Sequence, residues 1–259
     1  MTRLSCCVIS GYGAHLEVEA SDAMLLGAVL SDLPRGWNVC LDSSGCDWRF
    51  AVRREADCLV TTDGGGAQRA WPNVSGAQSA LREELRRYVG FHTPDLVFVH
   101  AGAVAYRDWA IVLPAPSFAG KSHLVRALVG AGAEFYSDEY AIFDRSGRVI
   151  QYREPLIARG PAGREETDIL AAGPDRPIPV GLVVVTSYRE GTTWAPRKVS
   201  VSDAIVAAME HASRARPRAA EVMATLRLAF KEATVLVGER GDAEQTAADL
   251  LEFADHNLA

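Results

Sequence analysis

The amino-acid sequence predicts an α/β protein, in which a small β-rich N-terminal region precedes a larger domain that combines strands and helices. Three observations predict this class. Short apolar runs separated by turn residues fill the first 75 residues. A predicted hairpin then leads into a loop of small residues and a helix. Beyond that helix, apolar strand patterns occur together with amphipathic helices. We therefore divide the chain into residues 1–75 and residues 76–259.

The N-terminal region consists mainly of short predicted strands. They are Cys6–Ser10, His15–Ala20, Trp37–Leu41, Trp48–Val52 and Cys58–Thr61. Asp42–Gly45, which is rich in turn-forming residues, joins the third strand to the fourth. The segment Asp22–Leu30 is compatible with a short helix. Thr62–Gly66 has the small residues of a phosphate loop, but no helical pattern follows it directly, so we interpret it as a flexible turn.

All the cysteines of the chain lie in this region. They are Cys6, Cys7, Cys40, Cys46 and Cys58. Their number is odd, and they lack the C-x-x-C or Cys/His spacing that is typical of zinc sites. We interpret them as small buried hydrophobic residues in a reducing compartment. A metal or redox site is the alternative.

A helix is predicted over Ala77–Val89, because apolar residues recur there at helical spacing. Leu96–Tyr106 and Trp109–Leu113 are predicted strands that form a hairpin. The second arm leads into the next loop, whereas a Rossmann-type fold would cross over to a parallel strand. His100 lies in the first arm. A single histidine after apolar residues is more often a core residue than a catalytic one, so its spacing alone assigns it no function.

The segment Pro114–Ser122 reads PAPSFAGKS and lies between the strand Trp109–Leu113 and a helical pattern. Strand, small-residue loop, Gly-Lys-Ser and helix together are the layout of a phosphate-binding P-loop. Backbone N–H groups surround phosphate oxygens, a lysine reaches the outer phosphates, and a serine hydroxyl ligates Mg²⁺. The residues expected to contact the nucleotide are Ser117, Phe118, Ala119, Gly120, Lys121 and Ser122.

This loop has an irregular first half. Ala115 stands where glycine is usual, and Pro116 has no N–H group to offer to phosphate. An ordinary strand-to-helix turn is therefore the alternative. The strand–loop–helix context favours phosphate binding.

The segment Glu134–Asp144 is a predicted strand, with Asp138 and Glu139 at a strand end or in a bulge. Close to a P-loop, one carboxylate of such a pair can hold Mg²⁺ and the other can accept a proton from the attacking hydroxyl. The alternative is a solvated turn with two surface acids. Because one strand–loop–helix–strand unit connects the pair to the loop, we favour the functional interpretation.

The rest of the chain has a mixed pattern. Further strands and helices are predicted at Val180–Val185, Ser202–Ala212, Arg218–Phe230, Thr234–Val237 and Ala243–Ala254. Gly160–Pro179, rich in glycine, proline and charge, is either a mobile loop over the site or a plain surface connection. Arg214–Arg218 is interpreted as a solvated loop, with a site for an acidic peptide or phosphate as the alternative.

Composition limits the class of partner. The chain has 259 residues, of which 48% are hydrophobic, enough for a full core. A net charge of −6 and a pI near 5.6 argue against a nucleic-acid-binding protein. No apolar run approaches the roughly 20 residues of a membrane span, and the first residues lack a signal-peptide pattern. We expect a cytoplasmic protein with no membrane partner.

Three short strings, His100–Gly102, Ser117–Ser122 and Tyr136–Tyr140, resemble the active-site string of the HPr serine kinase/phosphorylase family. They are more similar still to the short HPr-kinase-related proteins of bacterial biosynthetic clusters, some of which phosphorylate peptide natural products. The resemblance covers about residues 95–160. It implies a twisted mixed sheet of the type shared by HPr kinase and ATP-dependent phosphoenolpyruvate carboxykinase. The predicted hairpin before the loop agrees with that fold.

The resemblance also implies ATP and Mg²⁺ as cofactors and a role for each matched residue. Lys121 would bind the β- and γ-phosphates, and Ser122 would bind Mg²⁺. Asp138 would be the general base toward an acceptor hydroxyl, with Glu139 as a second metal ligand. His100 matches an active-site histidine that polarises phosphate or partners the base.

A further matched position and several departures qualify the resemblance. Arg159 is the basic residue after the acidic strand and would face the transferred phosphate as a catalytic group. Ala115 and Phe118 stand where the family has glycines. The long Glu/Arg/Gly signature associated with phosphorolysis is not found. Kinase chemistry therefore fits the sequence better than phosphorylase chemistry.

From these observations we expect an ATP-dependent kinase that transfers the γ-phosphoryl group to a hydroxyl, on a serine of a peptide or on a small metabolite. A nucleotide-binding regulatory or partner-binding module without transfer is the first alternative, favoured by Ala115 and Pro116. An enzyme acting on another phosphoryl group, carboxykinase-like or phosphorylase-like, is the second. The sequence identifies neither the acceptor nor whether the protein works as a homo-oligomer.

Overall fold

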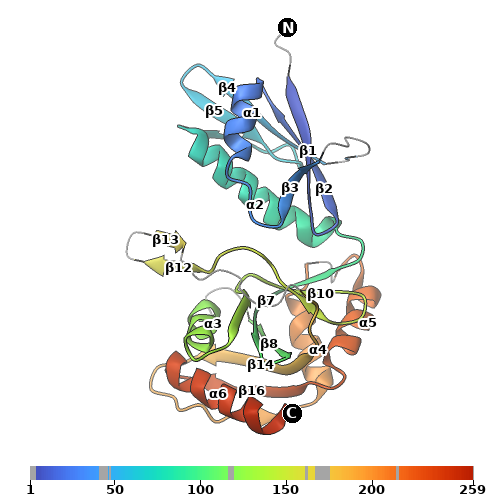
Figure 1. Ribbon diagram of the computed structural model, residues 1–259, viewed down its shortest axis with the longest axis vertical. Coiled ribbons are helices and arrows are strands. Elements are labelled where there is room, and N and C mark those ends of the chain that lie inside the picture. Colours follow the sequence, from blue (N-terminus) through green and yellow to red (C-terminus); the bar gives the residue numbers. More distant parts are fainter. Residues whose placement is uncertain are drawn as a thin grey trace. The chain divides into compact units, whose positions relative to one another are not determined.

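The computed structural model of the chain describes residues 4–40, 46, 48–115, 120–160, 163–166, 176–213 and 216–258. The chain divides into two structural units, Met1–Pro94 and Asp95–Ala259 (Figure 1). Both units combine strands with helices, as the α/β composition predicts. None of the helices within the described residues is both long and apolar enough to cross a membrane.

The N-terminal unit is a sheet packed against two helices, and its strand order is β3-β1-β2-β4-β5-β6. The strands are β1 (Ser5–Gly11), β2 (Ala14–Ala20), β3 (Trp37–Cys40), β4 (Arg49–Glu55), β5 (Cys58–Thr62) and β6 (Gln68–Trp71). The helices are α1 (Ala23–Leu30) and α2 (Val74–His92). The β-rich character of this region is thus confirmed, and Asp22 caps α1 by accepting from Leu25 N at 2.8 Å. Strand β6 was not predicted, because its residues are mostly exposed and carry no apolar alternation.

Helix α2 belongs to the N-terminal unit. Its apolar stripe is buried, and its polar side chains also bond to the N-terminal strands and loops. Trp48 Nε1 donates to the buried Glu84 at 2.6 Å, and Tyr88 Oη donates to the carbonyl of His15 at 2.6 Å. The division between the units therefore follows Pro94, after α2, whereas the sequence analysis placed it at residues 75 and 76.

Thr62 ends β5, and the residues after it, including Gly64, Gly65 and Gly66, connect β5 to β6. Asp63 Oδ1 accepts the backbone N–H groups of Gly65 and Ala67, at 3.0 and 2.9 Å. The turn thus satisfies its own N–H groups with its own carboxylate. The interpretation of this glycine-rich segment as a turn is confirmed.

The cysteines are free thiols. Cys6 is exposed, and the others are partly buried. The expectation that all five are buried is therefore wrong, most clearly for Cys6. Cys40 Sγ lies 2.9 Å from Ser10 Oγ, to which it donates across the pairing of β3 with β1.

The C-terminal unit is built on a mixed sheet with the strand order β11-β10-β7-β8-β14-β16-β15, and β9 also pairs with β7. The strands are β7 (Val97–Tyr106), β8 (Trp109–Pro114), β9 (Glu134–Ser137), β10 (Tyr140–Phe143), β11 (Val149–Ile150), β14 (Val180–Tyr188), β15 (Arg197–Lys198) and β16 (Thr234–Arg240). Strands β7 and β8 form the predicted antiparallel hairpin. Strands β8, β14 and β16 run parallel, so their carboxyl ends meet at one edge of the sheet.

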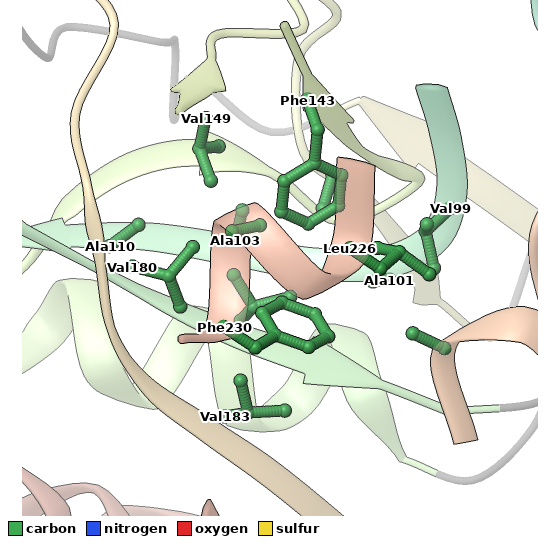
Figure 2. Close-up of a cluster of buried hydrophobic side chains, with 14 of the residues drawn as sticks. Val99, Ala101, Ala103, Ala110, Phe143, Val149, Val180, Val183, Leu226 and Phe230 are labelled. Carbon is green, nitrogen blue, oxygen red and sulfur yellow. The ribbon is translucent and has the colours of Figure 1, made fainter. Parts of the chain in front are cut away.

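Helices cover both faces of this sheet (Figure 1). They are α3 (Lys121–Gly130), α4 (Val201–Glu210), α5 (Ala219–Phe230) and α6 (Ala243–Asn257). Helices α3 and α6 share one buried cluster with the sheet, and α4 and α5 share the other. Figure 2 shows the second cluster, where Leu226 and Phe230 of α5 meet Val99, Val183 and Phe143 of the strands. The helices predicted in this part of the chain are confirmed, with ends that differ by a few residues.

Several predicted segments, Pro114–Ser122 among them, fall wholly or partly outside the described residues. Asp42–Gly45 lies outside them. Of Gly160–Pro179, the structure describes residue 160, the strand β13 (Gly163–Glu166) and residues 176–179, and β13 pairs with β12 (Ile157–Gly160). Of Arg214–Arg218, it describes residues 216–218, where Arg218 forms an ion pair with Glu221.

Candidate functional site

The candidate site lies at the carboxyl edge of the parallel strands, where β8 ends at Pro114 and α3 begins at Lys121. Gly120 is the N-cap of α3, with a left-handed backbone (φ 78°) that favours glycine. Within the described residues, no side chain caps this helix by a hydrogen bond to its first N–H groups. Such a helix N-terminus suits an anion. Pro116, Ser117, Phe118 and Ala119 lie outside the described residues, so the expected phosphate contacts of Ser117, Phe118 and Ala119 stay a prediction.

Gly102 of β7 lets α3 approach the sheet. A Cβ atom at this position would lie 2.6 Å from Val125 Cγ2 and 3.2 Å from Lys121 Cγ. Real Cβ contacts are essentially never shorter than 3.0 Å, so a side chain here would push the helix away. The glycine in the His100-Ala101-Gly102 string therefore brings Lys121 close to His100.

Lys121 is buried, with 9% of its surface exposed, although it carries a charged group. Its Nζ atom lies 2.9 Å from His100 Nε2 and 3.3 Å from His100 Nδ1. Burial lowers the pKa of Lys121 to about 8, while the carboxylates of Glu139 and Asp138 oppose the shift. The lysine thus contacts a histidine and is stabilised electrostatically by two acids.

His100 is the next group in the site. Burial, followed by the charge of Lys121, lowers its pKa, whereas Glu139 acts in the opposite direction. The imidazole is therefore mainly neutral at pH 7. Its Nε2 atom lies 4.0 Å from Glu139 Oε1. The structure thus brings His100 together with the lysine and the acidic pair, which its spacing alone did not indicate.

The acidic pair, Asp138 and Glu139, lies in the irregular connection between β9 and β10, as the sequence analysis expected. Ser137 pairs with Ala103 of β7, whereas Tyr140 pairs with His100, so Asp138 and Glu139 lie between the two pairings. Ser137 Oγ accepts the backbone N–H groups of Glu139 and Tyr140, at 3.0 and 2.9 Å. These hydrogen bonds fix the backbone of the irregular connection that carries the two carboxylates.

Asp138 contacts the serine of the Gly-Lys-Ser string. Ser122 Oγ donates to Asp138 Oδ2 at 2.9 Å. Burial raises the pKa of Asp138, and the charge of Glu139 adds to this, while the Ser122 hydroxyl and Lys121 oppose it. Burial is thus the larger cause of the raised pKa, ahead of the charge of Glu139.

The oxygen atoms of this site suit Mg²⁺. The Ser122 hydroxyl and the carboxylates of Asp138 and Glu139 are hard oxygen donors on neighbouring segments, and Mg²⁺ prefers such ligands. Arg159 lies in β12, where it pairs through its backbone with Arg164 of β13. Its side chain is not among those described, so its catalytic role stays a prediction.

Two further basic residues reach the site, and the sequence analysis missed both. Arg240, the last residue of β16, is 2% exposed and donates from Nη2 to the carbonyl of Gly120 at 2.7 Å. His211, directly after α4, accepts from His100 N through its backbone carbonyl at 2.9 Å. Burial lowers the pKa of His211, and Lys121 adds to the effect. The signal for Arg240 was a cation three residues beyond the apolar run Thr234–Val237, a pattern that surface arginines share.

Comparison with known proteins finds likeness only among solved structures. No protein-family model matches the chain, and no curated protein matches it in sequence. Among solved structures, the chain is similar to the Hpr(Ser) kinase/phosphatase from Coxiella burnetii, at 12% identity and a TM-score of 0.34. The match covers 62% of this chain and 96% of that chain. Likeness at this level is a distant structural relationship, so the chemistry of the site rests on the residues of this chain.

Proposed function

We propose that the C-terminal unit is an ATP-dependent kinase that transfers the γ-phosphoryl group to the hydroxyl of a peptide serine or of a small metabolite. One observation carries the proposal. The serine of the Gly-Lys-Ser string and the first acid of the Asp-Glu pair meet at 2.9 Å between Ser122 Oγ and Asp138 Oδ2. Phosphoryl transfer needs a phosphate-binding element and a carboxylate together at one place, because its catalysis is mainly positioning and charge stabilisation.

The residues of the site divide between binding and proton transfer. Lys121 in its protonated form attracts the outer phosphates, and the uncapped N-terminus of α3 adds partial positive charge. Ser122 and Glu139 would hold Mg²⁺, which would neutralise charge on the phosphate oxygens when bound. Arg240 fixes the carbonyl of Gly120 and so the entry into α3. Arg159 is proposed to face the transferred group.

Asp138 is the proposed general base. It accepts the proton of the acceptor hydroxyl while the acceptor oxygen forms a bond to the γ-phosphorus, and the bond from that phosphorus to the bridging oxygen breaks to release ADP. A carboxylate whose pKa is raised by burial holds that proton better than an exposed one. The neutral His100 contacts Lys121 and lies near Glu139, so it orients the lysine rather than adding a second positive charge.

A second function is favoured by the loop itself. Pro116 has no N–H group, and Ala115 replaces a residue that is usually glycine, so the first half of the loop offers fewer phosphate contacts than a regular P-loop. A module that binds a nucleotide and regulates a partner without phosphoryl transfer would tolerate this loss better than a kinase.

Two variants test the proposal. Mg-ATP at about one hundred times its Kd stabilises a protein by about 2.7 kcal/mol, several degrees in Tm. We expect this shift in the wild type and in Asp138→Asn, and its loss in Lys121→Ala. The matched control is Lys231→Ala, an exposed lysine far along the sequence, which should keep the shift.

Release of inorganic phosphate from ATP, with water as the acceptor, separates the two functions. Asp138→Asn should lower this release by about a hundredfold or more, because removal of a general base costs that much. If Asp138→Asn releases phosphate as fast as the wild type, the assigned base is wrong. Nucleotide binding without any phosphate release would favour the regulatory module, and no thermal shift in the wild type would refute both functions.

A further inference from the structure

The order of the strands indicates in which direction a bound nucleotide extends from its phosphates. This inference rests on the proposed function. His100 lies on β7 and the acidic pair lies between β9 and β10, on one side of β8 in the sheet. Strands β14 and β16 lie on the other side of β8. With the transferred phosphate next to Asp138, the nucleoside must extend the opposite way, over the carboxyl ends of β14 and β16.

Tyr188 is at that place. It is the last residue of β14, and it is 56% exposed although it is a large aromatic residue. Successive side chains alternate along a strand, so Tyr188 shares a face with Val184, which packs into the cluster of α3 and α6. Its Cβ lies 3.6 Å from where a Cβ at Gly120 would be. The ring therefore begins directly beside the N-terminus of α3.

Arg240 fixes this ring in position. Its guanidinium carbon lies 5.7 Å from the centre of the Tyr188 ring, within the range of a cation–π contact. The same guanidinium donates to the carbonyls of Gly120 and Gly241, at 2.7 and 3.1 Å. These bonds limit the motion of the arginine, so that the tyrosine has a fixed partner on one side and solvent on the other.

Arg240 forms no direct ion pair with a carboxylate in the described part of the chain, although Asp242 and Glu244 act on its charge from a greater distance. Its Nε is buried without a hydrogen bond. The Thr186 hydroxyl, two residues before Tyr188 on the same strand face, is likewise buried without a partner. Buried polar groups are normally paired, and an unpaired buried cation is costly. An anionic ligand at the N-terminus of α3 would compensate the arginine charge.

We propose that Tyr188, held by Arg240, is the stacking surface for the base of a purine nucleotide whose phosphates lie at the N-terminus of α3. A planar base on the exposed face of Tyr188 gains aromatic contact area without a conformational change in the ring. A purine covers more of this surface than a pyrimidine does. Tyr188 is thus a specificity-determining residue, and Arg240 is a positioning residue that acts through it.

The test compares Mg-ATP with Mg-tripolyphosphate, which carries the phosphates without a base, by isothermal titration calorimetry. Tyr188→Ala should weaken Mg-ATP binding about tenfold, as loss of one base–aromatic stack does, and should leave Mg-tripolyphosphate binding unchanged. Tyr188→Phe keeps the ring and should bind both compounds as the wild type does. Preference for Mg-ATP over Mg-CTP should be present in the wild type and absent in Tyr188→Ala.

Tyr106→Ala is the matched control, because Tyr106 also has an arginine over its ring, Arg107 at 5.6 Å, but lies at the opposite end of the sheet. It should bind both compounds as the wild type does. If Tyr188→Ala binds Mg-ATP unchanged, while Lys121→Ala loses it, the base lies elsewhere and this inference is wrong. If the wild type binds neither compound, the proposed function fails, and the inference fails with it.

Discussion

Replacing Lys121 by methionine should make the protein more stable while removing nucleotide binding. Burial lowers the pKa of Lys121 from 10.5 to about 8, although Glu139 and Asp138 oppose the shift. At pH 7 the lysine is protonated in both the folded and the unfolded chain, so the folded state carries the whole penalty of the buried charge. Each unit of pKa corresponds to about 1.4 kcal/mol, so Lys121→Met should stabilise the fold by about 3 kcal/mol.

The pH profile gives this prediction its specificity. Between pH 8 and 10.5 the unfolded chain keeps the proton on Lys121 and the folded chain releases it, so wild-type stability rises with pH there. The advantage of Lys121→Met should therefore shrink to about 2 kcal/mol at pH 9 and about 1 kcal/mol at pH 10. Guanidinium denaturation followed by circular dichroism measures the difference at each pH.

The pH dependence of this stability difference separates the loss of a buried charge from the gain of apolar contact. The apolar contacts of methionine do not change with pH, because methionine does not titrate. Lys231→Met, at an exposed lysine, is the control and should change stability by less than about 0.5 kcal/mol at every pH. A variant Lys121→Met that is less stable than the wild type at pH 7, or whose advantage is the same at pH 7 and pH 10, would refute the reasoning.

Two further predictions follow from the same geometry. Affinity for Mg-tripolyphosphate should fall about tenfold between pH 7 and pH 9, because the protonated fraction of a lysine with a pKa of about 8 falls from about nine-tenths to one-tenth. Calorimetry should show this slope in the wild type and not in Lys121→Arg, whose guanidinium stays charged, and a flat wild-type profile would contradict the assignment. Gly102→Ala should lower the free energy of unfolding by about 1–3 kcal/mol, because its Cβ would overlap Val125, whereas Gly130→Ala on α3, with no neighbour within 4 Å, should be neutral or stabilising. Equal denaturation midpoints for these two variants would show that α3 does not need Gly102.

Much of the fold could be predicted from local pattern. The hairpin of β7 and β8 and the long helix α2 have strong periodicity, which tertiary packing did not override. The meeting of Ser122 with Asp138 was also predictable, because one strand–loop–helix–strand unit joins them and leaves few ways to arrange it. The sequence did not predict that α2 belongs to the N-terminal unit. Periodicity shows that a helix has an apolar face, but not which sheet covers that face.

The sequence analysis missed Arg240 and His211 for the same physical reason. Arg240 contacts Gly120 across 120 residues of sequence, and this depends on β16 lying next to β14 at the edge where β8 ends. His211 reaches His100 because the segment after α4 pairs with β7 beyond the end of β8. Neither position carries a local pattern that distinguishes it from a surface residue. The strand order that makes them neighbours follows from the packing of the whole unit.

The energetics of the site favour a chemical task over a structural one. Lys121 occupies a buried position on α3 where an apolar side chain of similar length would avoid the cost of a desolvated charge. Asp138 is also shifted toward its neutral form by burial, and burial likewise lowers the pKa of Arg240, which forms no direct ion pair with a carboxylate among the described residues. Packing alone gives no reason for three such groups to gather at one helix N-terminus. A ligand that carries several negative charges and binds a cation would relieve all three at once, which is the property of a Mg-nucleotide.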